Sequence, residues 1–176
     1  MSSINRNEHK SPKILAEVAI FIALATALSM IPGWHLPQGG SVTYASMVPL
    51  LWLALRRGPK VGIFAGVVYG FVQLAILSQV YYPTQVLLDY PLAFGCIGLA
   101  GFFKNHTITG AIVAIIGRFT RHLISGAIFF ASYAPSGMNP WVYSCIYNGS
   151  FMVFELLISC AVLALLQKNR VLKTYM

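Results

Sequence analysis

Apolar residues gather in six runs along the chain, with short polar segments between them. The runs cover residues 14–31, 42–55, 61–78, 85–103, 109–132 and 141–166. A helix that crosses a membrane needs about 20 predominantly apolar residues. The pattern therefore predicts an all-α membrane protein with six transmembrane helices, in a single integral membrane domain that covers residues 1–176. The second run is short and contains Pro49, so its limits are the hardest to place.

The basic residues alternate between successive connections. Connections 32–41, 79–84 and 133–140 carry no Lys or Arg, whereas both tails and the other two connections carry Arg6, Lys10, Lys13, Arg56, Arg57, Lys60, Lys104, Lys168, Arg170 and Lys173. Connections rich in Lys and Arg stay in the cytoplasm. We therefore expect both ends of the chain to be cytoplasmic.

Composition narrows the class further. Apolar residues make up 57% of the chain and charged residues 9%, with a mean hydropathy of +0.72, which excludes an ordinary soluble domain. The net charge of +8 comes from cations beside the predicted cytoplasmic headgroups, so we expect no nucleic-acid partner. The three cysteines form no metal-binding pattern, and no phosphate-binding loop for ATP is present. We predict no catalytic residues, metal site or cofactor.

Small residues recur at helical spacing in three of the runs: Ala19, Ala23 and Ala27; Gly62, Gly66 and Gly70; Gly95, Gly98 and Gly101. Such ridges let helices approach closely in lipid. They can serve packing within the bundle or docking of a partner membrane subunit. The alanine ridge of the first run is the preferred docking candidate.

Ionisable residues inside spans are costly and suggest functional sites. Arg118 and Glu155 lie at the same depth, about 21 Å below the outer surface by helical rise, and we predict that they form a structural ion pair. Asp89 differs because no Lys or Arg lies near it in any outer loop. Its positive partner is either Arg121 or a cationic ligand that enters from outside.

Aromatic residues favour the ligand. The outer half carries Trp34, Tyr69, Tyr81, Tyr82, Tyr90, Phe129, Phe130, Tyr133, Trp141, Tyr143 and Tyr147. Part of this set is the aromatic belt that membrane proteins share, but rings around a carboxylate also suit a flat organic cation. Helical spacing places His122, Gly126 and Phe130 on one stripe and Asn148 on a facing one. We expect His122 and Asn148 to converge with Asp89, and Gly126 to leave room for a ring.

Several motifs resemble one family. The runs HLISGAIFFASYAPSG (122–137) and PWVYSCIYN (140–148), with LPQGGS (36–41), LRRG (55–58) and LLDY (87–90), are similar to the thiamine-binding S components of energy-coupling factor (ECF) transporters, the ThiT family of YuaJ type. The resemblance implies a six-helix protein that binds thiamine at its outer face. It also implies docking on one membrane coupling subunit and two ATPase subunits, which supply the ATP hydrolysis.

The resemblance also implies roles for individual residues. Asp89 would balance the thiazolium charge and accept a hydrogen bond from the aminopyrimidine, with Tyr90 beside it. The other implied ligand contacts are Trp34, His122, Tyr143 and Asn148, while Tyr69 and Phe130 stand where some members have stacking tryptophans; we add Tyr81 from the outer aromatic set. The coupling subunit would meet Ala19, Ala23 and Ala27.

Three alternatives remain open. The ligand could be a related pyrimidine precursor, which lacks the thiazolium ring. The protein could be a stand-alone vitamin facilitator. An intramembrane enzyme that uses Asp89 and His122 as acid and base is the rival from another class, although no nucleophile motif accompanies these two residues.

Overall fold

The computed structural model describes residues 10–31, 33–37, 40–77 and 80–169. Helix α2 (Lys10–Ser29) is followed by a two-strand hairpin, β1 (Trp34–His35) and β2 (Ser41–Val42). Helices α3 (Met47–Arg57) and α4 (Pro59–Leu77) come next. A broken helical segment then comprises α5 (Pro83–Leu87), the π-turn η2 (Leu88–Leu92), α6 (Ala93–Gly95) and the 3₁₀ segment η3 (Cys96–Phe102), and the chain ends with α7 (Thr107–Phe129), the short turn η4 (Ala131–Tyr133) and α8 (Pro140–Lys168).

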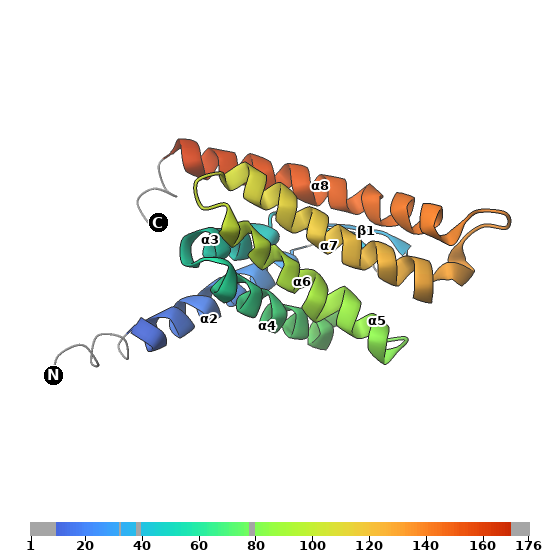
Figure 1. Cartoon of the computed structure of the whole chain (residues 1–176), viewed down its shortest axis with the longest axis horizontal. Coiled ribbons are helices and arrows are strands. Elements are labelled where there is room, and N and C mark those ends of the chain that lie inside the picture. The colour runs from blue at the N-terminus through green and yellow to red at the C-terminus, as the bar shows by residue number, and fades with distance from the viewer. Residues whose placement is uncertain (1–9, 32, 38–39, 78–79, 170–176) are drawn as a thin grey trace.

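The helices form one elongated bundle (Figure 1). Helices α7 and α8 run antiparallel along one side of it, and the broken segment packs between α7 and α4. Helix α2 lies at the edge and contacts α3 and α4. The start of α2 and the end of α8 lie at the same end of the bundle (Figure 1).

Five helical segments are long and apolar enough to cross a membrane: Pro12–Ser29, Pro59–Ile76, Pro83–Phe102, Thr107–Phe129 and Pro140–Lys168. These match five of the six predicted runs. The run 42–55 differs, because its helix α3 has 11 residues and rises about 16 Å, well short of the bilayer core of about 30 Å. Pro49 lies in the first turn of α3, where proline is tolerated, and the residues before it form the hairpin and an irregular segment.

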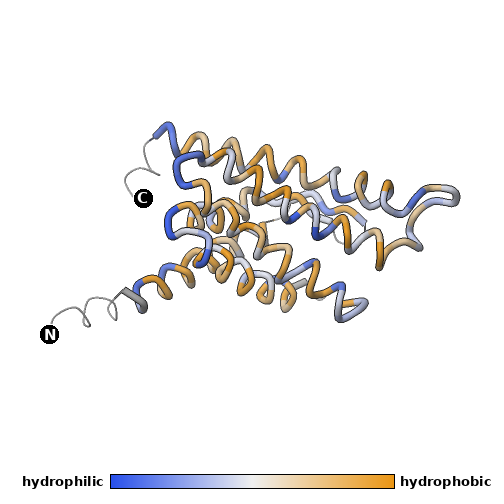
Figure 2. Tube along the Cα trace, in the orientation of Figure 1, coloured by the Kyte–Doolittle hydropathy of each residue, from blue (hydrophilic) through white to orange (hydrophobic). Residues whose placement is uncertain are grey.

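Hydropathy follows the long axis of the bundle. The helix middles are hydrophobic, and hydrophilic residues gather at the end where α2 begins and α8 ends (Figure 2). Large apolar side chains on the outside, such as Ile20, Phe64 and Leu157, are more than half exposed. An outer surface of this kind suits lipid contact. The protein is therefore an all-α, multi-pass membrane protein.

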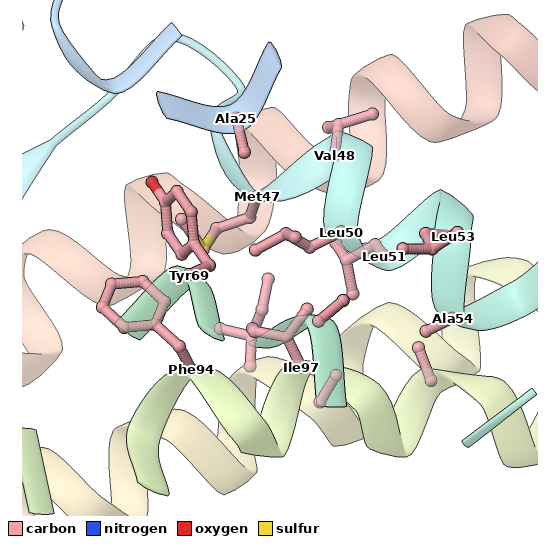
Figure 3. Close-up of a cluster of buried hydrophobic side chains, with 14 of the residues drawn as sticks. Ala25, Met47, Val48, Leu50, Leu51, Leu53, Ala54, Tyr69, Phe94 and Ile97 are labelled. Carbon is pink, nitrogen blue, oxygen red and sulfur yellow. The ribbon is translucent and has the colours of Figure 1, made fainter. Parts of the chain in front are cut away.

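The core centres on α3, which lies almost entirely within the bundle. Leu50, Leu51 and Leu53 of α3 are fully buried and pack with Phe94 and Ile97 of the broken segment (Figure 3). Below them, α4 and η3 approach so closely that a β-carbon added at Gly98 would lie 2.1 Å from the Ile63 nitrogen. Helices α3 and α4 and the broken segment therefore form the tightly packed core of the bundle.

Candidate functional site

A cavity of about 130 Å³ lies inside the bundle. A single water occupies about 10–15 Å³ by this measure, so the cavity has room for a small organic molecule. Helices α3, α4, α7 and α8, the broken segment and the irregular segment 40–46 all contribute to its walls. Eight predicted site residues line it: Tyr69, Asp89, Tyr90, His122, Gly126, Phe130, Tyr143 and Asn148.

Asp89 lies on the π-turn η2, two residues before Pro91. Its Oδ2 accepts hydrogen bonds from Gln85 Nε2 at 2.7 Å and Ser125 Oγ at 2.8 Å. Its Oδ1 lies 3.1 Å from His122 Nδ1. No Lys or Arg among the described residues forms an ion pair with Asp89, and the alternative partner Arg121 is exposed on α7. The carboxylate therefore faces the cavity without a guanidinium in direct contact, although Arg118 lines the same cavity.

The imidazole of His122 contacts Asp89 and also lines the cavity. With the proton on Nδ1, the ring donates to Asp89 Oδ1, and Nε2 presents an acceptor lone pair. That Nε2 is buried and has no partner among the described residues. The ring also packs edge-on against Phe151, at 6.3 Å between centroids. His122 is therefore oriented by Asp89 and keeps one nitrogen available for a ligand.

The amide group of Asn148 already makes hydrogen bonds within the protein. Its Nδ2 donates to the carbonyls of Ser144 at 2.9 Å and His122 at 3.3 Å. Its Oδ1 is therefore the atom that could accept a hydrogen bond from a ligand. Gly126 has a packing role besides leaving room, because an added β-carbon would lie 2.3 Å from Ser144 Oγ. The close approach of α7 and α8 therefore depends on this glycine.

Several aromatic rings line the cavity, among them Phe130, Tyr133, Tyr143 and Tyr147. Phe130 lies between Tyr81, edge-on at 5.3 Å, and Tyr133, tilted at 6.0 Å. On α8, Tyr143 and Tyr147 stack at 6.1 Å. Ring faces attract positive charge, so together with Asp89 they favour a cationic ligand over an anionic one.

Two predicted site residues lie outside the cavity lining. Trp34, on strand β1, is 70% exposed, and Tyr81 is 53% exposed but packs against Phe130. Tyr147 of α8, which lines the cavity, contacts the chain beside strand β1: its hydroxyl donates to the Pro37 carbonyl and accepts from Gly40 N at 2.9 Å. The ligand contact expected of Trp34 stays a prediction.

Arg118 and Glu155 both line the cavity and are 9% and 2% exposed. The predicted direct ion pair between them is wrong, since no such contact is found within the described residues. Glu155 Oε1 instead accepts from the backbone nitrogen and hydroxyl of Thr43, at 2.5 and 2.7 Å. The Arg118 guanidinium lies 4.4 Å from the Phe94 ring centroid and 3.2 Å from the Met47 sulfur.

Sequence reasoning missed several neutral polar residues of the site. Gln85 and Ser125 are 2% and 1% exposed and bind Asp89 directly, and Thr43 binds Glu155. Gln85 precedes Asp89 by four residues and Ser125 follows His122 by three, spacings that place each pair on one helical face. Among the described residues, no group of three His, Cys, Asp or Glu side chains forms a potential metal site.

The alanine ridge of α2 lies on the surface. One face of this helix is buried and carries Val18, Ile22 and Ala25. Another face is exposed and carries Ala19, Ala23 and Ala27. The glycines of α4 and η3 are buried between those two segments. The glycines thus serve packing within the bundle, whereas the docking role of the alanine ridge stays a prediction.

The fold and the cavity define the class: a multi-pass membrane protein whose helices enclose a ligand-sized cavity lined by two carboxylates, Asp89 and Glu155, the guanidinium of Arg118 and several aromatic rings. The family model "Thiamine transporter protein (Thia_YuaJ)" matches residues 15–174. The chain belongs to this family, and it is a protein of the bacterial cell membrane.

Relatives support the assignment over at least 90% of the chain. The chain is 39% identical to the thiamine transporter ThiT of Bacillus subtilis strain 168, over 91% of this chain and 93% of that protein. It is 31% identical to ThiT of Lacticaseibacillus paracasei, over 90% and 89% of the two chains. A solved structure of ThiT from Listeria monocytogenes superposes with a TM-score of 0.83 at 27% identity, and the match covers 91% of this chain and 96% of that one.

Proposed function

We propose that this protein captures thiamine in the cavity and serves as the S component of an ECF-type importer. The observation that carries the proposal is the Asp89 carboxylate, which faces the cavity with neutral donors and His122 as its partners. An unpaired charge in a low-dielectric site is costly. A cationic heterocycle would offset that cost, and family membership identifies the heterocycle as thiamine.

The lining suggests how the two rings of thiamine are bound. Asp89 lies beside the positive thiazolium, and aromatic faces such as that of Phe130 pack on the flat rings. Asn148 Oδ1 accepts from the amino group of the pyrimidine, and the Tyr143 hydroxyl bonds a ring nitrogen. His122 Nε2 supplies a further acceptor. None of these roles requires chemistry on the ligand, so the site binds and does not catalyse.

The decisive experiment is calorimetric titration of the purified protein with thiamine and with the uncharged 4-amino-5-hydroxymethyl-2-methylpyrimidine. Calorimetry is preferable to tryptophan fluorescence because Trp34, Trp52 and Trp141 all lie outside the cavity lining. Asp89→Asn keeps the shape but removes the charge. We expect it to weaken thiamine about 100-fold, as for a buried charge pair that loses one partner, and to weaken the neutral pyrimidine far less.

Glu17→Gln is the matched control, because it removes a carboxylate whose partners are Arg56 and Arg57 on α3. It should leave thiamine affinity unchanged. Equal weakening of both ligands by Asp89→Asn would show that the carboxylate is structural. Tighter binding of the neutral pyrimidine by the unaltered protein would instead identify a precursor as the ligand.

The energy for import would come from partner subunits, since the chain contains no phosphate-binding loop for ATP. The exposed alanine ridge of α2 is the proposed surface for the coupling subunit. Vesicles that contain this protein alone and vesicles that also contain the coupling subunit and two ATPases separate the possibilities. Thiamine uptake that requires the complete module supports the S-component role, whereas uptake by this protein alone would indicate a facilitator.

A further inference from the structure

The two oxygens of the Asp89 carboxylate have different surroundings. Oδ2 accepts two short hydrogen bonds, from Gln85 and Ser125, whereas Oδ1 has the longer contact to His122. An ionised carboxylate oxygen offers about two lone-pair sites. Oδ2 is therefore saturated by protein donors, and Oδ1 keeps the capacity to bind a ligand.

The amide orientation of Gln85 is determined by its neighbours. Its Oε1 accepts from the Tyr81 backbone nitrogen at 3.3 Å, so its Nε2 must point to Asp89. Residues 81, 85 and 89 follow one another at four-residue intervals. Through its two hydrogen bonds, Gln85 connects Tyr81 to the Asp89 carboxylate. The Tyr81 ring in turn packs against Phe130 in the cavity wall.

Ser125 approaches the same oxygen from the other side. It belongs to α7, while Gln85 belongs to α5, so the carboxylate is held between two separate segments. Both donors are almost completely buried. Both donors are also neutral, so they hold the carboxylate in place without offsetting its negative charge. An Arg or Lys at either position would offset that charge.

We infer that Gln85 and Ser125 form a carboxylate clamp: two positioning residues that aim Asp89 Oδ1 at the ligand and preserve the site's preference for a cation over a neutral molecule. The inference rests on the proposed function, because it concerns the same carboxylate. It adds that cation selectivity depends on two side chains that do not themselves meet the positive ring.

The test is a double-mutant cycle measured by calorimetry with thiamine and with the neutral pyrimidine. Ser125→Ala and Gln85→Met each remove one hydrogen bond to a charged group, and we expect each to weaken thiamine about 10-fold. In the Asp89→Asn background the same changes should alter thiamine affinity by less than about 2-fold, because groups that act through one residue are non-additive. Affinity for the neutral pyrimidine should change little in every variant.

Ser159→Ala is the matched control, since Ser159 is a fully buried serine of α8 without a hydrogen-bond partner among the described residues. It should leave thiamine affinity unchanged. Equal losses from the clamp variants with and without the Asp89 carboxylate, or equal losses for both ligands, would overturn the inference and assign both residues to general packing. Failure of the unaltered protein to bind thiamine would instead overturn the proposed function, so the two failures are distinct. Thermal melting in detergent verifies that each variant is folded, and Ser125→Ala alone tests the inference if Gln85→Met does not fold.

Discussion

Helices α2 and α4 look alike in sequence and differ in the structure. Both are apolar, they have 20 and 19 residues, and each carries small residues at every fourth position. The glycines of α4 are buried against the broken segment, where a β-carbon at Gly66 would lie 2.2 Å from the Phe94 carbonyl oxygen. The ridge alanines of α2, Ala19, Ala23 and Ala27, are exposed.

The difference shows that spacing alone does not say what a ridge of small residues is for. Between α4 and the broken segment the backbones are so close that even a methyl group has no room. This interface therefore lies inside the bundle. In α2 the ridge alanines are exposed, where small side chains would allow another helix to approach closely. The choice of glycine or alanine separates these two cases.

The largest effect should come from filling the α4–η3 seam. In Gly98→Ala the new methyl group would lie 2.1 Å from the Ile63 nitrogen, so the backbones must separate. We expect a loss of about 3 kcal/mol or more in stability, seen as a marked fall in melting temperature in detergent. Gly149→Ala on α8 is the control, because its β-carbon would meet no atom within 4 Å, and it should melt at the same temperature or slightly higher. Equal melting of both variants would contradict the close packing of α4 against η3.

A smaller effect is expected where α2 is attached to α3. Glu17 lies 2.9 Å from Arg56 Nη1 and 2.5 Å from Arg57 Nη2. The arginines are about a third exposed, so Glu17→Gln should cost about 1 kcal/mol, with a modest fall in melting temperature that shrinks at high salt. Glu17→Asp, which keeps the charge, should recover part of the loss. A fall in melting temperature as large as that of Gly98→Ala would mean that α2 is integral to the core.

The smallest effect on the isolated protein should come from Ala23→Leu. Because Ala23 is exposed, the larger side chain has room, and both melting temperature and thiamine affinity should stay unchanged. Uptake by vesicles that contain the complete ATPase module should nevertheless fall sharply if α2 is the docking helix. Ala75→Leu, at an exposed alanine of α4, is the control and should retain uptake. Full uptake by Ala23→Leu would place the docking surface elsewhere.

Most of the fold could be predicted because lipid imposes a simple requirement on each span. Long apolar runs gave the positions of α2, α4, α7, α8 and the broken segment, and the pattern of small residues indicated close helix contacts. The short length of α3 could not be foreseen from hydropathy, since an apolar stretch buried by protein resembles one buried by lipid. The π-turn that presents Asp89 contains Pro91, which lies close to Gly70 of α4; the proline indicates a break in the helix but not the direction in which Asp89 points.

The site was predictable to the extent that its residues are unusual in a membrane. A carboxylate, a histidine and a group of rings are conspicuous there, and eight of the ten chosen residues line the cavity. Gln85 and Ser125 are not conspicuous, because neutral polar residues are common in spans and become informative once helix rotation is known. The expected contact between Arg118 and Glu155 failed for the same reason: equal depth does not fix the direction in which each side chain points.

The short helix α3 has one further consequence. Helix α3 has 11 residues and α4 has 19, a difference of eight residues. This difference corresponds to about 12 Å of helix that is absent from the centre of the bundle. Gly40, Ser41, Thr43 and Ser46, in the irregular stretch that replaces it, form part of the cavity wall. The cavity wall is thus formed in part by chain that is not helical, and a variant in which this stretch continued α3 as a helix would be expected to lose these wall residues and with them part of the cavity.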